Sequence, residues 1–440
     1  MNIVAKKYTM KDLAFKGFFL LSILLSLLCI AFDLTELICI EALMVVVNSV
    51  ILFLLNKNNV FLCYILGTIA FSNYSICFTN YISPNPNTIF TGLSDTYVGF
   101  IGLQVLLLFI ALLGIFFDCR TFNTFDLHFF NTNVVQNRRF YIYHILNYIA
   151  LLFILVFAYT RPDTVGDRGS PSTIYEYSIL LITVGFYFSR YNKFIQSGYV
   201  ISVLLFALQN FIFGGRITGL QLLFVLLIYI YGNKRVSLKL LLTIGILYVV
   251  MVSIGSLRGN ILSGNAITIF QQLDYLLQNG FSLDTAYSSY FTSLQFILTS
   301  ELISISQRLY MGLLQILSYI IGGTLLPEAN IAVFVSNFYT NYMGGVLPFF
   351  GYFCFGWLGV LLCAVLVVFY LNQFKRLPSL IDKECQHGFL LCIAVYLSAT
   401  AFRWYLYSPN NLIRGVFLLG IVYFLTIKFL CFQTTDKSIN

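Results

Sequence analysis

Residues 98–117 read Val-Gly-Phe-Ile-Gly-Leu-Gln-Val-Leu-Leu-Leu-Phe-Ile-Ala-Leu-Leu-Gly-Ile-Phe-Phe, a run of 20 residues without a charged side chain. A helix that crosses a bilayer needs about 20 mostly apolar residues, so this run predicts a membrane-spanning helix. The rest of the chain has the same character, because 59% of its residues are apolar and 10% are charged. Ordinary soluble domains carry about 25% charged residues, which excludes a soluble globular protein. Disorder is excluded by the same composition, and we expect an all-α polytopic integral membrane protein.

Apolar runs between polar breaks predict about twelve spans within a single transmembrane domain, residues 1–440. They are 14–32, 37–55, 60–78, 98–117, 141–159, 175–189, 195–213, 217–231, 239–257, 346–371, 388–402 and 412–428. One loop, Gly255–Gly345, is far longer than the others. Within it, Leu283–Ile321 has an amphipathic helical pattern that suits helices lying in the membrane interface. A further hairpin in that loop would raise the number of spans to fourteen.

The basic residues predict the orientation of the chain. Cytoplasmic loops of membrane proteins carry an excess of Lys and Arg. With both termini inside, 18 of the 25 basic residues, including all twelve Lys, face the cytoplasm. The other side keeps seven residues, all Arg: Arg161, Arg168, Arg216, Arg258, Arg308, Arg403 and Arg414. The long loop is therefore expected in the periplasm.

Four of these arginines end apolar runs. Arg216, Arg403 and Arg414 flank runs of only 15, 15 and 13 residues, and Arg258 follows a longer one. An ionisable group at membrane depth normally faces a cavity or a partner. Several guanidinium groups together would suit pyrophosphate, with Arg308 as a further member of the site. The alternative is that each side chain reaches separately to the interface.

Carboxylates of the long loop are candidates for a general base. Glu328, which follows Pro327, is the first candidate and Asp274 the reserve. Either could instead be a solvated loop residue or a helix cap. Asp163 and Asp167 are weak evidence for a metal, and we expect no metal and no cofactor. By this topology all three His lie at the cytoplasmic side.

Residues 330–359 are dense in Asn, aromatic residues and Gly. Asn330, Tyr339 and Asn341 are candidates to hydrogen-bond and stack on sugars. An aromatic belt is the alternative. Gly351, Gly356 and Gly359 predict close helix packing.

The order of these landmarks resembles that of the O-antigen polymerases (Wzy-type) and related oligosaccharide repeat unit polymerases. The resemblance covers roughly residues 195–430. Its landmarks are Phe213–Arg216 before a short span, Ser256–Asn260 after the next span, the long loop with Pro327, Asn330, Tyr339, Gly345, Gly351 and Gly359, and finally Arg403 and Arg414.

The resemblance implies a GT-C-like glycosyltransferase of the bacterial inner membrane. Its donor and acceptor would be undecaprenyl-pyrophosphate-linked oligosaccharides, joined at the periplasmic face, and a chain-length regulator in the membrane is a further expected partner. Nucleic acid is not expected as a partner. A lipid-linked oligosaccharide flippase and an O-antigen ligase are the alternatives. The ligases look to an external His beside Arg, which this topology does not provide, and a structural or sensor membrane protein is a more distant reading.

Reporter fusions test this topology. A fusion at Asn279 should report the periplasm and one at Gln373 the cytoplasm, because the basic residues divide 18 to 7. A cytoplasmic signal at Asn279 would contradict both the orientation and the functional prediction that depends on it.

Overall fold

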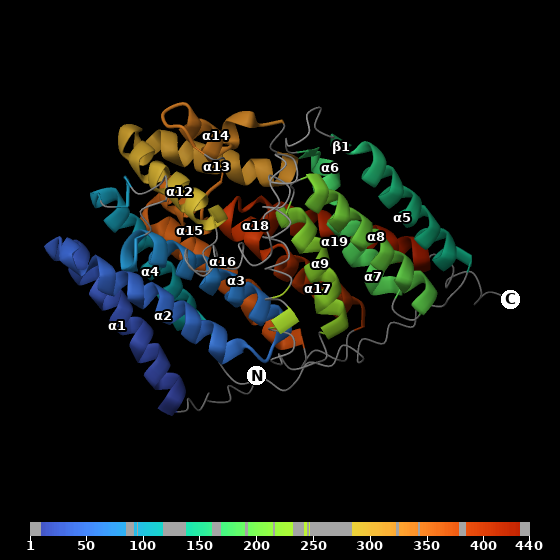
Figure 1. Cartoon of the computed structure of the whole chain (residues 1–440), viewed down its shortest axis with the longest axis horizontal. Coiled ribbons are helices and arrows are strands. Elements are labelled where there is room, and N and C mark those ends of the chain that lie inside the picture. Colours follow the sequence, from blue (N-terminus) through green and yellow to red (C-terminus); the bar gives the residue numbers. More distant parts are fainter. Residues whose placement is uncertain are drawn as a thin grey trace, which may run out of the picture. The chain divides into compact units, whose positions relative to one another are not determined.

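The computed structural model describes residues 10–84, 92–94, 96–117, 138–160, 169–189, 192–213, 216–231, 242–243, 246, 284–322, 325–341, 344–377 and 384–431. These residues are almost entirely helical (Figure 1). Because hydrocarbon offers no water to backbone N–H and C=O groups, a spanning segment satisfies them within its own helix. Apart from the helices there is one two-stranded antiparallel sheet, β1 (Tyr159–Thr160) with β2 (Ser170–Pro171).

Eight helices of the described residues are long and apolar enough to cross a membrane. The chain is therefore an all-α membrane protein, as its composition predicted. The eight are α1 (Met10–Phe32), α2 (Ile38–Asn56), α3 (Val60–Cys77), α4 (Tyr97–Phe116), α5 (Arg138–Phe157), α8 (Lys193–Phe213), α16 (Trp357–Arg376) and α19 (Asn410–Cys431).

Seven of these helices coincide with a predicted span, and α16 forms the second part of the predicted span 346–371. Three further predicted spans form shorter helices instead, which are α7 (Ser178–Ser189), α9 (Arg216–Tyr231) and α17 (Glu384–Ala399). The predicted span 239–257 lies almost entirely outside the described residues. Twelve spans in one transmembrane domain over residues 1–440 thus stay a prediction.

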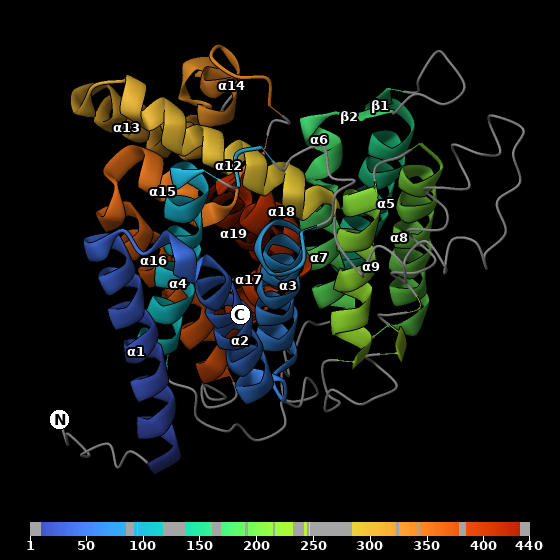
Figure 2. The same cartoon turned by 60° about the vertical axis from the view of Figure 1, so that its left-hand side comes forward.

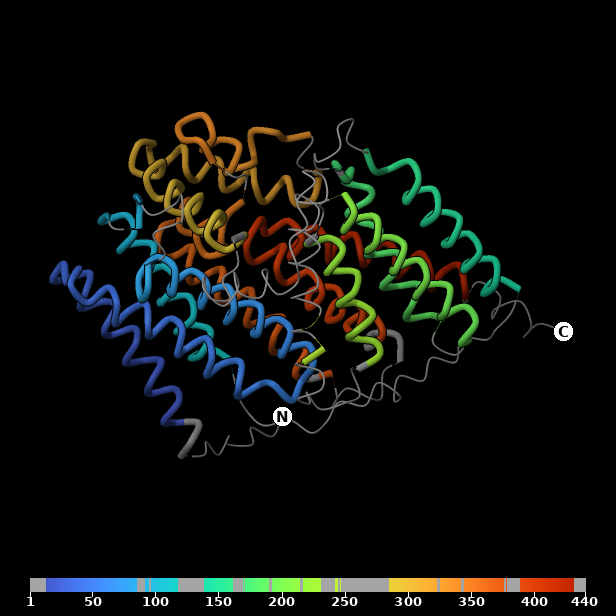
Figure 3. Tube along the Cα trace, viewed as in Figure 1, coloured from blue at the N-terminus to red at the C-terminus, as the bar shows by residue number. Residues whose placement is uncertain are grey.

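The chain divides into two compact units. The first comprises Met1–Asn123, Phe281–Lys375 and Ala401–Pro409, and the second comprises Thr124–Gly280, Arg376–Thr400 and Asn410–Asn440. In the first unit α2 packs on α3 and α4, and α1 packs on α4. A later part of the chain returns to these helices, as the tube trace shows (Figure 3). This part is α12 (Asp284–Leu302), which contacts α3 and α4.

A layer of helices covers one end of the spanning helices of the first unit (Figure 2). It consists of α12, α13 (Ile305–Ile321), the 3-10 turn η4 (Pro327–Ala329) and α14 (Ile331–Ser336). The layer touches η2 (Phe78–Ile82), the continuation of α3, because Thr79 Oγ1 donates to Tyr287 Oη at 2.5 Å. Since η2 follows the end of α3, the layer lies at the end of the unit where α1 and α3 finish and α2 and α4 begin.

The helical prediction for Leu283–Ile321 is confirmed, but its two halves differ. Ser304 separates them by capping α13, with its Oγ accepting from Gln307 N at 3.3 Å. α12 is buried along most of its length and carries buried Ser, Thr and Gln side chains. Only α13 has the pattern expected of an interfacial helix.

The predicted span 346–371 consists of two helices, α15 (Leu347–Phe355) and α16. Gly356 separates them with φ at +60°, a conformation that favours glycine. Gly351 and Gly359 then bring the two backbones together, since a Cβ on either glycine would overlap the other's carbonyl group. The prediction of close packing is confirmed for Gly351 and Gly359. A Cβ on Gly356 would meet nothing within 4 Å, so this glycine serves the turn instead.

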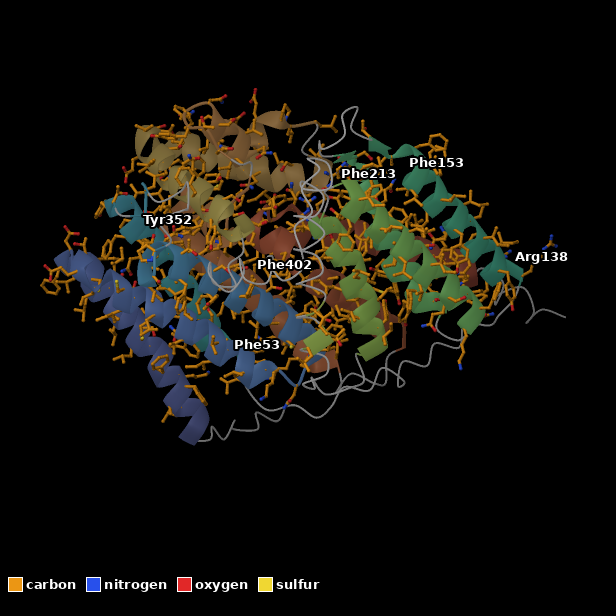
Figure 4. All side chains as sticks on the ribbon, viewed as in Figure 1. Phe53, Arg138, Phe153, Phe213, Tyr352 and Phe402 are labelled. Carbon is orange, nitrogen blue, oxygen red and sulfur yellow. The ribbon has the colours of Figure 1, made fainter. Side chains whose placement is uncertain are left out.

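In the second unit α7 packs on α5, α8, α17 and α19, and α9 packs on α8 and α17. The short α6 (Thr173–Glu176) leads into α7 after the β1–β2 pair. Apolar side chains cover the outside of α5, as Phe153 illustrates in Figure 4 with 63% of its surface exposed. Such an exterior is typical of a lipid-facing helix.

Gly359→Ala should destabilise the α15–α16 pair by about 1–3 kcal/mol, because its methyl group meets backbone that cannot turn aside. The measurement is thermal unfolding of the purified protein in detergent. Gly17→Ala on α1 is the control, since a Cβ there has nothing within 4 Å. Equal unfolding temperatures for the two variants would contradict the packing described here.

Candidate functional site

Arg308 is held at the junction of the helical layer and the α15–α16 pair. It lies in the first two turns of α13 and is half-buried. Its Nε donates to the carbonyl of Phe353 at 2.6 Å, and its Nη2 donates to the carbonyl of Tyr352 at 2.9 Å. Figure 4 marks Tyr352 on α15. Both acceptors belong to the last turn of α15, the carbonyl end of the helix, which attracts a cation, and the Tyr352 carbonyl also accepts from the N–H of Gly356 at 2.8 Å.

This geometry gives Arg308 a structural task that its sequence context did not reveal. Two of its five N–H donors serve α15. The guanidinium charge and the remaining N–H donors are not used by these two bonds. Pyrophosphate binding by Arg308 remains a prediction.

Glu328 is exposed in η4, where Pro327 starts the turn. Proline fits the first position of such a turn because its fixed φ suits the helix and its missing N–H would have no partner there. The carboxylate is thus presented to the outside of the layer. Asp274, the reserve candidate for the base, lies outside the described residues.

The three candidate sugar-binding residues lie beside α14, a helix of the layer. Asn330 caps α14, and its Oδ1 accepts from the backbone N–H groups of Ala332 and Val333 at 3.1 and 3.3 Å. Asn341 Nδ2 donates to the Ala332 carbonyl at 2.8 Å. Tyr339 is half-buried on the turn between these two asparagines. All three residues therefore belong to α14 and the residues that flank it, and their binding of sugars remains a prediction.

Arg403 belongs to the first unit, on the short helix α18 (Ala401–Leu406), which contacts α12 and α15. Its guanidinium lies 5.3 Å from the centre of the Tyr407 ring. Withdrawal from water lowers the pKa of the Arg403 guanidinium. A cation with reduced hydration gains from an anionic partner.

The other predicted arginines lie in the second unit or outside the residues that the structure describes. Arg414 on α19 stacks 5.6 Å from the centre of the Tyr177 ring. Arg216 is the first residue of α9, and its side chain is outside the described residues. Arg161, Arg168 and Arg258 also lie outside them. Convergence of Arg216, Arg258, Arg403 and Arg414 on one cavity stays a prediction.

A buried carboxyl group in the first unit was not among the predicted site residues. Glu41 lies in the first turn of α2 and is fully buried. Gln104 Nε2 of α4 donates to Glu41 Oε1, and Ser26 Oγ of α1 donates to Gln104 Oε1. The sequence carries a signal for this buried site, because Glu41 and Gln104 lie within the predicted spans 37–55 and 98–117.

The described part of the chain contains no group of three His, Cys, Asp or Glu side chains that could hold a metal ion. The pair Asp163 and Asp167 lies outside that part. His144 is buried on α5, where its Nδ1 is 2.8 Å from Tyr199 Oη.

Comparison with known proteins adds no assignment, because no family model matches the chain and no curated protein or solved structure is similar to it.

Arg308→Met should lower the free energy of unfolding by at least about 1.5–3 kcal/mol, since one hydrogen bond from a charged donor already contributes that much and Arg308 makes two. Trp357 reports on this region, because its ring centre is 5.1 Å from that of Tyr352. The chain has two Trp, Trp357 and Trp404. Trp404 is therefore replaced by Phe in both the wild type and the Arg308→Met variant, which leaves Trp357 as the only indole. Unfolding followed by its fluorescence should shift, and an unchanged midpoint would contradict the anchoring role.

Proposed function

We propose that the chain is a membrane-embedded glycosyltransferase that polymerises O-antigen or another surface polysaccharide. It joins undecaprenyl-pyrophosphate-linked oligosaccharide units at the periplasmic face of the bacterial inner membrane. Twelve spans, cytoplasmic termini and a periplasmic loop over Gly255–Gly345 are parts of this proposal. The resemblance of residues 195–430 to the repeat unit polymerases is its starting point.

The observation that carries the proposal is the orientation of α13. Its buried residues are Gly312, Gln315 and Ser318 together with Met311 and Tyr319, whereas most of its Leu and Ile side chains face outward, with Ile305 72% and Leu313 59% exposed. A helix with this arrangement gains free energy when lipid covers its outer face. Arg308 places a cation on the same helix. Apolar surface beside a cation suits a substrate with a lipid tail and a pyrophosphate head.

The position of the helical layer supports the proposed orientation. The layer lies at the end of the first unit where α1 finishes, opposite to the end where α1 begins. Lys6, Lys7, Lys11 and Lys16 precede or open α1. By the positive-inside rule those lysines face the cytoplasm, and the layer then faces the periplasm.

The reaction in this proposal is a displacement at the anomeric carbon of the donor. A hydroxyl oxygen of the acceptor unit bonds to that carbon while the bond to the lipid pyrophosphate breaks. Arg216, Arg258, Arg308, Arg403 and Arg414 stabilise the negative charge on the departing pyrophosphate. Glu328, or else Asp274, accepts the proton of the hydroxyl. Asn330, Tyr339 and Asn341 hold the sugars.

A transporter, such as a lipid-linked oligosaccharide flippase, is the second candidate. The observation in its favour is Glu41, because ionisable residues inside membrane spans often mark ion or substrate pathways. The polymerase is preferred because the sequence concentrates polar residues in one long loop, Gly255–Gly345, between the predicted spans.

A deletion strain that makes long-chain surface polysaccharide separates the two candidates. Loss of a polymerase leaves single repeat units on the lipopolysaccharide core. Loss of a flippase removes all repeat units and traps the precursor inside, and that result would contradict the proposal.

Complementation of the deletion then tests the residues. Arg216→Lys keeps the charge but loses the planar fork, so polysaccharide length should collapse to short products. Glu328→Gln should do the same if Glu328 is the base. Arg138→Lys and Glu301→Gln are matched controls on exposed residues. All variants are compared at equal membrane levels, and full-length polymer from Glu328→Gln would transfer the role to Asp274.

A further inference from the structure

Four buried polar residues meet inside the first unit, where α1, α2 and α4 pack together. We call them the Glu41 cluster, which consists of Ser26 and Cys29 of α1, Glu41 of α2 and Gln104 of α4. All four are at most 2% exposed. Ser26, Glu41 and Gln104 each lie six or seven residues from the same end of their spans. At about 1.5 Å per residue, that places the cluster about 10 Å inside the helical ends, within hydrocarbon depth.

The hydrogen bonds of the cluster have a definite direction. Ser26 Oγ donates to Gln104 Oε1, so the Gln104 amide presents its nitrogen to Glu41 and donates to Oε1. The Cys29 thiol lies beside the same carboxyl group. Oε2, the other carboxyl oxygen, is buried and has no hydrogen-bond partner within the described residues.

On the elements packed against α2, no cationic side chain that the structure describes lies close to this carboxyl group. The elements packed against α2 are α1, η1 (Thr35–Leu37), α3, η2 and α4. The last three contain no Asp, Glu, Lys or Arg. On α1, Lys16 precedes Ser26 by ten residues, which is about 15 Å along the helix. Asp33, between α1 and η1, and Glu36 of η1 are exposed and carry negative charge.

The remaining titratable groups on these elements are thiols and phenols. They are Cys29 on α1, Cys39 on α2 itself, Cys63, Tyr64, Tyr74 and Cys77 on α3, Tyr81 on η2 and Tyr97 on α4. Of these, Cys29 faces the carboxyl group. A neutral thiol and a neutral amide cannot balance a full negative charge in hydrocarbon.

We propose that Glu41 is a proton-binding site inside the membrane and that its proton is held on Oε2 while α1 is packed against α2 and α4. The neutral acid keeps the bond from Gln104 at Oε1 and avoids an uncompensated charge. Release of the proton then requires water or a cation to reach Oε2. Since α1 and α4 enclose the carboxyl group, proton release is coupled to separation of these helices. The ligand of the site is a proton, and the site is independent of the polymerase chemistry.

Infrared spectroscopy of the full chain in lipid vesicles at pH 8 tests the proposal directly. Exposed carboxyl groups are ionised at this pH, whereas a neutral acid retains its separate carbonyl stretch. The wild-type spectrum minus that of Glu41→Gln should contain one neutral-acid band. Glu36→Gln, on the adjacent exposed carboxylate, should remove only carboxylate absorption. A carboxylate band in the Glu41 difference would overturn the proposal.

The pH dependence of stability gives a second and independent test. A proton bound in the folded state and released on unfolding makes stability fall as pH rises above about 4.3, the ordinary range of an unfolded Glu. Relative to Glu41→Gln, the folded-to-unfolded ratio of the wild type should fall as the pH rises above that range, by up to about tenfold per pH unit. Unfolding by sodium dodecyl sulfate in mixed micelles measures this ratio. Parallel pH profiles would contradict the proposal even if the variant is less stable at every pH.

Discussion

The absence of water from the bilayer interior is the constraint on which this structure depends. A backbone group without a partner in hydrocarbon costs several kcal/mol, so the spanning segments are helices. The same constraint acts on side chains. Buried polar groups of the first unit are connected from helix to helix, as where Tyr405 Oη of α18 donates to Asn73 Oδ1 of α3 at 2.7 Å. Such bonds hold helices whose outer surfaces lie in lipid, where the hydrophobic effect between helices is weak.

This constraint also explains why α13 is unusual. In water its apolar residues would turn inward and its Gly, Gln and Ser residues outward. The helix instead buries Gly312, Gln315 and Ser318 beside Met311 and Tyr319 and exposes most of its Leu and Ile side chains. Arg308 attaches its first turn to the carbonyl groups that end α15. A surface that exposes apolar side chains next to an arginine is compatible with the membrane interface and with lipid-borne anions. The functional proposal rests on this combination together with the sequence resemblance.

The sequence predicted the helical class and the eight long spans because length and apolar content decide them. It did not predict that 346–371 breaks at Gly356, since a left-handed glycine leaves the hydropathy of the run unchanged. It also did not predict the burial of α12. In the sequence, the Ser, Thr and Gln residues of this helix indicate a solvent-facing surface, and their burial follows only from the helices that cover them in the fold. Arg308 was expected to bind substrate, but its partners on α15 are 44 and 45 residues away in sequence and follow only from the fold. Glu41 was not predicted as a site residue, because the predicted site consisted of arginines at span ends and carboxylates of the long loop, whereas Glu41 lies inside a span.

The central claim is that the protein elongates a lipid-linked glycan at the membrane surface. The most direct measurement places the purified chain in liposomes that contain a polyprenyl-pyrophosphate-linked oligosaccharide in both leaflets, without nucleotide sugar. A polymerase should produce a ladder of longer lipid-linked chains, and the Arg216→Lys variant should not produce it. Unchanged oligosaccharide length, together with movement of the labelled lipid from one leaflet to the other, would contradict the central claim and identify a transporter.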